Sequence, residues 1–119
     1  MPPRDAARLR DILYASQLVA KFVQGLILED FLANLEKRSA VAYQLVIIGE
    51  AVTHLSKELK ERHPEVPWAF IKGMRNIATH EYGRLDYVTV WVAASTEVPE
   101  LATRIQAILR EVAETESSP

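Results

Sequence analysis

The segment from 38 to 62 constrains the fold more than any other part of the chain. Its apolar residues step along the sequence by 4, 3, 4, 3 and 4 positions. This heptad-like spacing is typical of a bundle helix that packs along its whole length. We therefore predict one long helix over 38–62, and its apolar stripe consists of Val41, Leu45, Ile48, Val52, Leu55 and Leu59.

A second row on the same predicted helix has the same spacing and consists of Tyr43, Ile47, Glu50 and His54. Together the two rows make the helix apolar nearly all round between 40 and 48. A helix that is buried on two sides in a chain of only 119 residues indicates a partner subunit in addition to the core. We therefore expect this helix to contact a second chain.

Further helices are predicted from apolar periodicity and from breaks at glycine and proline. Gly25 ends the first of them, and Asp30 is a candidate N-cap for the short helix that follows. Pro99 cannot donate a hydrogen bond to the carbonyl of Ser95, so we expect the last helix to be kinked there. The predicted ranges are 4–24, 30–35, 68–80 and 88–112, with a frayed polar tail over 113–119.

The composition agrees with a small helical domain. Apolar residues make up 49% of the chain, only four glycines are present, and alanine and leucine are plentiful. We predict an all-α up-and-down bundle of four main helices plus a short one, forming a single domain over 1–119. No apolar run approaches the length of a membrane span, and the N-terminus lacks an apolar signal core, so we expect a cytoplasmic protein.

The absence of cysteine and the placement of charge narrow the chemistry. Without cysteine there is no disulfide framework, thiol nucleophile or thiolate metal site. His54 and His63 lack the spacing of a zinc helix, so we expect neither a metal nor a cofactor. The net charge is −2, yet the segment 54–84 holds six lysines and arginines against four acids, together with all three histidines. An anion is therefore expected to bind in this segment.

The stretch MRNIATHEYG, from 74 to 83, places four large polar side chains near one predicted helix end: Arg75, Asn76, His80 and Tyr82. Asn76 and His80 share a helix face because they are four residues apart. The guanidinium of Arg75 offers donors that match a phosphate, and His80 titrates near neutrality. Together these groups are the minimum needed to cleave a phosphodiester in RNA, and they require no metal.

A structural explanation of the same residues stays open at this point. Arginine and histidine near a helix C-terminus complement the helix dipole and cap its carbonyls. An arginine followed five residues later by a histidine also occurs by chance in many helical proteins. Glu50 interrupts an otherwise apolar helix, and it is either exposed, paired with a base, or able to orient Arg75 or His80.

Four segments in this order resemble the HepT-like branch of the HEPN superfamily, which consists of small helical toxins from toxin–antitoxin pairs. The segments are IIGEAVTHLSKEL, HPEVPW, MRNIATHEYG and the VW pair at 90–91. The R-x4-H-x-Y signature of this family maps onto Arg75, His80 and Tyr82, with Asn76 at its usual polar position. The IGEA segment of the family places Glu50 near the site.

The resemblance implies metal-independent RNA cleavage in a cleft between the two copies of a homodimer. It assigns Arg75 to phosphate binding, His80 to general acid/base work and Asn76 to orientation. It also implies a minimal nucleotidyltransferase antitoxin, which attaches AMP to Tyr82 and so silences the toxin. One departure from the family is Glu81, which stands where a glycine is frequent and places an acid beside the site.

Two other functions are compatible with the same residues. The chain could be a non-catalytic subunit that binds a nucleotide or positions a nucleotidyltransferase partner. It could also be a purely structural dimeric bundle. RNA cleavage without added metal would distinguish a ribonuclease toxin from both alternatives.

Overall fold

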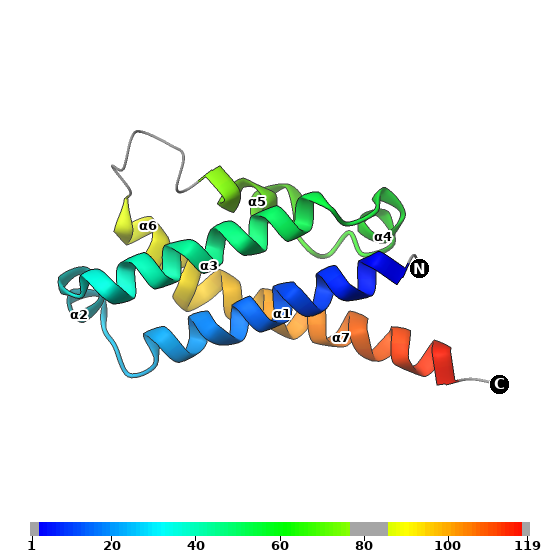
Figure 1. Cartoon of the computed structure of the whole chain (residues 1–119), viewed down its shortest axis with the longest axis horizontal. Helices are drawn as coiled ribbons and strands as arrows, with labels where there is room; N and C mark the ends of the chain where they lie inside the picture. The colour runs from blue at the N-terminus through cyan, green and yellow to red at the C-terminus, as the bar shows by residue number, and fades with distance from the viewer. Residues whose placement is uncertain (1–2, 77–85, 118–119) are drawn as a thin grey trace.

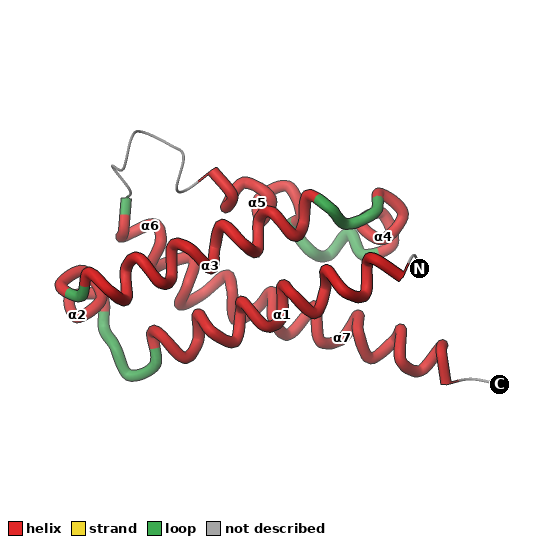
Figure 2. Tube along the Cα trace, viewed as in Figure 1, coloured by secondary structure: helices red, strands yellow, loops and turns green. Residues whose placement is uncertain are grey.

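A computed structural model describes residues 3–76 and 86–117, and in these ranges the chain consists of helices and connecting loops without a strand (Figures 1 and 2). The all-α prediction is therefore confirmed. In chain order the elements are α1 (Pro3–Val23), α2 (Leu28–Ala33), α3 (Leu35–Thr53), α4 (Lys57–Arg62), α5 (Trp68–Lys72), the 3₁₀ turn η1 (Gly73–Asn76), α6 (Tyr87–Val92), the π-helical turn η3 (Ala93–Glu97) and α7 (Val98–Ser117).

The long helices form the bundle around one apolar core. Figure 1 shows α1 and α3 side by side along most of their lengths, with α7 packed against α1. All six residues of the predicted stripe are at most 5% exposed, which confirms that the stripe faces the core. Burying a side chain of this size contributes about 1.5–3 kcal/mol, so this row accounts for a large part of the folding free energy.

The single helix predicted over 38–62 is in fact two helices, because α3 ends at Thr53 and α4 begins at Lys57. The carboxylate of Asp5, at the start of α1, accepts hydrogen bonds from the backbone nitrogen and the hydroxyl of Ser56, at 2.9 and 2.5 Å. The Ser56 hydroxyl oxygen in turn accepts from the backbone nitrogen of Leu59 and caps α4. The carboxylate of Asp5 therefore holds the turn at Ser56, between the end of α3 and the start of α4.

The short second helix begins earlier than the predicted 30–35, at Leu28. Asp30 is not its N-cap, because Asp30 lies inside the first turn and accepts a hydrogen bond from the backbone nitrogen of Ile27, at 3.1 Å. The N-cap that the sequence does supply is Asn34, whose side chain accepts from the backbone nitrogen of Lys37 at the start of α3. The chain therefore turns sharply between α2 and α3.

The break predicted at HPEVPW is present, and α5 begins at Trp68. The indole nitrogen of Trp68 donates to the carbonyl of His63 at 2.9 Å, which holds the loop against the start of α5. The helix predicted over 68–80 tightens into the 3₁₀ turn η1 after Lys72. Residues 77–80 of that prediction lie outside the described part of the chain.

The segment predicted as one long helix is irregular where a kink was expected. The side chain of Asp86 accepts from the backbone nitrogens of Val88 and Thr89 and so begins α6. The π turn η3 then lies directly before Val98 and Pro99. Because Pro99 has no N–H for the carbonyl of Ser95, a wider turn is accommodated there. The helix continues to Ser117, into the segment for which fraying was expected.

Among the described helices, none combines the length and the apolar character that crossing a lipid bilayer requires.

Candidate functional site

Arg75 lies in η1, and this turn packs directly on α3 at Gly49. A Cβ atom added to Gly49 would overlap the backbone nitrogen of Arg75 and would lie 3.0 Å from the carbonyl oxygen of Lys72. Real Cβ atoms essentially never approach backbone so closely. Only glycine therefore allows η1 to lie against α3 in this way, and Gly49 sets the position of the Arg75 backbone.

The side chain of Arg75 is held from the same face of α3. One of its terminal nitrogens, Nη1, donates to the hydroxyl oxygen of Thr53 at 3.4 Å. That hydroxyl donates to the carbonyl of Gly49 at 3.1 Å, which fixes the position of its oxygen. A guanidinium carries five N–H donors in a planar fork, the arrangement that suits a phosphate. Gly49 and Thr53 together therefore form the seat of Arg75.

Glu50 follows Gly49 in sequence but belongs to the neighbouring face of α3, about 100° further round the helix. Its carboxylate lies 3.5 Å from Nε2 of His54, and both side chains are about half exposed. The sequence left Glu50 exposed, paired with a base, or able to orient Arg75 or His80, and the structure shows it exposed and beside the imidazole of His54. A role in supporting Arg75 stays a prediction.

A groove of about 350 Å³ runs between α1 and α3 beside this pair. The second row predicted on α3 lies along it, and Tyr43 at the far end of that row is 64% exposed. Tyr14 on α1 is also largely exposed. The residues that line the groove are Arg8, Asp11, Tyr14, Ala15, Leu18, Gln44, Ile47, Glu50, Ala51 and His54. The α1–α3 face is therefore a partly apolar surface, and it shares the helix α3 with the seat of Arg75.

The structure describes only some of the residues that the sequence motif singled out. Arg75 and Asn76 are adjacent in η1, and the side chain of Asn76 is exposed. His80 and Tyr82 lie outside the described residues, as does Glu81. Thr53 was missed by sequence reasoning. The signal that could have found it is a hydroxyl residue one helical turn after the glycine of the IIGEA segment.

In the ranges that the structure describes, no group of three or more histidine, aspartate or glutamate side chains could hold a metal ion. Nδ1 of His63 lies 3.3 Å from the carboxylate of Glu65 at the break before α5. Its other ring nitrogen lies 3.9 Å from the carboxylate of Glu111 on α7. This imidazole therefore joins the loop to the last helix.

Comparison with known proteins agrees with the motif. A family model described as "Ribonuclease HepT-like" matches residues 4–108, from the first turn of α1 into α7. This match confirms the resemblance noted from the four sequence segments. No solved structure matches the chain.

Individual relatives cover nearly all of the chain. It is 35% identical over 113 residues to "Putative RNase MJ1216" of Methanocaldococcus jannaschii, which spans 94% of this chain and 93% of that protein. It is 38% identical over 102 residues to "Putative RNase TTE0752" of Caldanaerobacter subterraneus, which spans 86% and 91%. It is 33% identical over 98 residues to "Probable ribonuclease HepT" of Thermococcus cleftensis, which spans 82% and 89%.

Proposed function

The chain belongs to the HepT-like ribonuclease family, and on that premise we propose that it is a toxin that cleaves RNA without a metal ion. The observation that carries this proposal is the seat of Arg75. Its backbone is fixed against Gly49 and its guanidinium against Thr53, so a phosphate-binding group is held in place before substrate arrives. Preorganised charge of this kind is usually the largest single contribution to stabilising a transition state.

The proposed reaction uses the 2′-hydroxyl of the RNA as the nucleophile. His80 takes its proton, and the 2′-oxygen forms a bond to phosphorus while the bond to the 5′-oxygen of the next nucleotide breaks. His80 returns that proton through solvent water to the leaving oxygen, which gives a 2′,3′-cyclic phosphate and a free 5′-hydroxyl. Arg75 binds the phosphate oxygens as negative charge grows on them, and Asn76 orients the substrate.

A matched set of variants tests this assignment. Purified protein is incubated with RNA in the presence of a chelator, and the cut ends are analysed for cyclic phosphate. We expect His80→Ala and Arg75→Ala to lose cleavage by about 100-fold or more. Arg10→Ala removes an exposed arginine from α1 and serves as the control. Cleavage that persists in both site variants would overturn the roles of Arg75 and His80.

We propose that the active form is a homodimer in which a second copy covers the α1–α3 face. The exposed rings of Tyr14 and Tyr43 support this arrangement, since large exposed apolar groups are typical of partner surfaces. The row of Glu50 and His54 lies one face round α3 from the seat of Arg75, so a partner bound there would approach the phosphate site. We expect Tyr43→Glu to give a monomer by light scattering and to lose cleavage. A dimer that survives this change would exclude the face as the interface.

We further propose that a minimal nucleotidyltransferase antitoxin silences the protein by transferring AMP from ATP to the hydroxyl of Tyr82, with release of pyrophosphate. Family membership and the tyrosine of the motif support this proposal. Intact mass after co-expression with a minimal nucleotidyltransferase should show added AMP. Tyr82→Phe should abolish the added mass, and an unchanged mass in the wild-type protein would contradict the proposal.

A second candidate function is a non-catalytic subunit that binds a nucleotide or a nucleotidyltransferase partner. The observation that favours it is Glu81, an acid inside the motif that opposes the approach of RNA. This candidate predicts AMP transfer or partner binding without any RNA cleavage. If the wild-type protein cuts no RNA and the Glu81→Gly variant does, Glu81 is the cause of the inactivity.

A further inference from the structure

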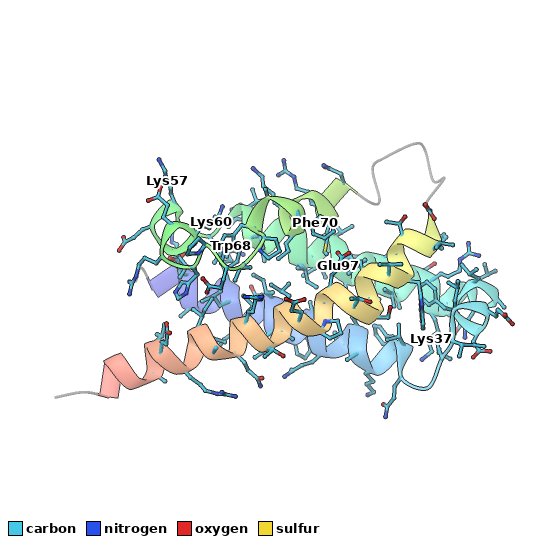
Figure 3. The ribbon with its side chains drawn as sticks, turned by 180° about the vertical axis from the view of Figure 1, so that it is seen from behind. Lys37, Lys57, Lys60, Trp68, Phe70 and Glu97 are labelled. Carbon is cyan, nitrogen blue, oxygen red and sulfur yellow. The ribbon has the colours of Figure 1, made fainter. Side chains whose placement is uncertain are left out.

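A second hollow of about 270 Å³ lies between α5 and the start of α7, and we call it the α5–α7 pocket. On the α5 side it is apolar, and the ring of Phe70 there is 55% exposed. Figure 3 shows Phe70 and Glu97 facing each other from the two elements. The volume is slightly below the range of about 300–1,000 Å³ for drug-sized ligands, so the pocket suits a single flat ring system. Its lining consists of Pro67, Phe70, Ile71, Glu97, Glu100, Leu101 and Arg104.

Two polar atoms in this lining are buried and, among the described residues, have no hydrogen-bond partner. They are the carboxylate oxygen Oε2 of Glu97 and the guanidinium nitrogen Nε of Arg104. Buried polar atoms in folded proteins nearly always have a partner, because burial without one is unfavourable. One orphan accepts a hydrogen bond and the other donates one. Both atoms are shielded from solvent, so a ligand that satisfies both must shift the side chains over them and needs a donor and an acceptor on its edge.

The electrostatic surroundings of Glu97 support this reading. Burial raises the pKa of the Glu97 carboxyl above its usual value, and desolvation is the cause. The guanidinium of Arg104 is instead engaged by Glu100, with Nη2 donating to the carboxylate at 2.9 Å. Glu97 therefore gains from a neutral donor that enters the pocket, since such a donor would replace the water that the carboxylate has lost.

The backbone fixes these groups on one side of α7. Glu97 is the last residue of the π turn η3, and Glu100, Leu101 and Arg104 follow it at three, four and seven residues. That spacing places all four side chains on one helix face. Turns of the π type are frequent at functional sites. The side of the pocket formed by η3 and α7 is therefore built on helix and not on a loop.

We propose that the α5–α7 pocket is a base-recognition subsite that takes an unpaired guanine of the RNA substrate. Guanine presents two adjacent donors, N1–H and the N2 amino group, which match the carboxylate of Glu97. Its O6 and N7 atoms are acceptors of the kind that arginine reads, and they match the donor of Arg104. The ring of Phe70 provides a face on which the base stacks. This inference rests on the proposed RNA cleavage.

The position of the pocket fits a nucleotide next to the cleavage site. Phe70 precedes Arg75 by five residues along α5 and η1, which corresponds to roughly 8–10 Å along the helix axis. The two carboxylates of the pocket outnumber its one guanidinium, so the pocket disfavours a phosphate. Exposed Lys72 and the seat of Arg75 lie just beyond the pocket and favour a phosphate. The acidic pocket therefore suits the neutral base, and the basic residues beyond it suit the phosphate.

Direct binding of nucleosides tests the pocket without involving the phosphate site. Guanosine, adenosine, cytidine and uridine are titrated into the full-length protein and followed by NMR signals of the Leu101 methyl groups, which line the same pocket. We expect guanosine to bind about tenfold more tightly than the other three. Glu97→Gln should remove this preference, and Phe70→Ala should weaken all nucleoside binding by about tenfold, while Phe70→Tyr restores it. Glu58→Gln removes an exposed carboxylate outside the pocket and is the matched control.

The cut-site pattern on RNA provides the second readout. Oligonucleotides that carry one guanine at successive positions should be cut at a fixed offset from it, and Glu97→Gln should abolish that offset. Equal binding of the four nucleosides, or a guanosine preference unchanged in Glu97→Gln, would overturn the subsite. A protein that binds guanosine but cuts no RNA would overturn the proposed cleavage and leave the pocket standing.

Discussion

The backbone nitrogen of Arg75 lies against Gly49 so closely that no side chain fits between η1 and α3. The contact joins two of the sequence segments that mark the family, IIGEA and MRNIATHEYG. It explains in physical terms why a glycine belongs in the middle of a core helix, where it would otherwise lower stability. The position of Arg75, the residue proposed to bind phosphate, is therefore decided on α3, 26 residues before it in the sequence.

Gly49→Ala should displace Arg75 and weaken the fold. The added methyl group meets backbone atoms, which cannot rotate away, so we expect a loss of about 1–3 kcal/mol in the free energy of unfolding. The rate of RNA cleavage should fall by more than the loss of folded protein explains. Gly73→Ala is the matched control, because a Cβ there meets nothing within 4 Å in the described structure and the backbone is α-helical. The control should be neutral or stabilised by about 0.4–1 kcal/mol. Equal effects of both changes would contradict the close contact.

Thr53→Val should lower cleavage without unfolding the protein. The change keeps the shape of the side chain but removes the hydroxyl that accepts from Nη1 of Arg75. Since this hydrogen bond is long, at 3.4 Å, we expect a loss of about threefold in kcat/KM. Thr53→Ser retains the hydroxyl and should restore activity. If valine and serine behave alike, the hydroxyl does not position the guanidinium.

Asp5→Ala should destabilise the protein strongly although Asp5 is polar and near the start of the chain. The side chain is 1% exposed, and its loss leaves the backbone nitrogen and the hydroxyl of Ser56 without their acceptor. We expect a cost of about 2–4 kcal/mol in chemical denaturation. Asp11→Ala, an exposed position on the same helix, should change stability by less than about 0.5 kcal/mol. Combining Asp5→Ala with Ser56→Ala should cost less than the sum of the single changes, because both remove one contact.

Glu97→Gln should stabilise the protein at neutral pH. Burial raises the pKa of Glu97 above its usual value of 4.5, so the folded state holds its proton more tightly than the unfolded state does. Ionised Glu97 therefore opposes folding as the pH rises above this usual value and through the raised pKa. Melting curves at several pH values should show a higher melting temperature for the variant at pH 7, and the difference should disappear as the pH falls below 4.5. An equal increase in melting temperature at pH 7 and below pH 4.5 would rule out titration of Glu97 as the cause.

Local patterns predicted much of the fold because the core is built from helices with regular periodicity. The stripe from Val41 to Leu59 is buried as its spacing requires, and the break at HPEVPW follows from proline chemistry. The end of α3 at Thr53 could not be predicted in this way. It depends on Asp5, which is 51 residues from Ser56 in sequence, and the apolar spacing continues through the break without a signal.

The residues of the candidate site were predicted from their chemical type, but the contacts that hold them were not. The motif drew attention to Arg75, but its contacts with Gly49 and Thr53 cross from one helix to another and leave no periodic trace. The unpartnered atoms of Glu97 and Arg104 likewise depend on how α5 and α7 pack. Sequence analysis selects candidate groups by their chemistry, whereas only the fold shows which contacts hold Arg75.

The contact between Asp5 and Ser56 has a consequence for a chain that has no cysteine. It joins residues that are 51 positions apart and so closes a loop containing most of α1 and all of α2 and α3, through one carboxylate and no covalent bond. Such a closure is reversible and can be opened by a change at either end. A truncation or fusion that disturbs the first turn of α1 would therefore loosen the loop between α3 and α4. The last turn of α3, which carries Thr53, would loosen with it.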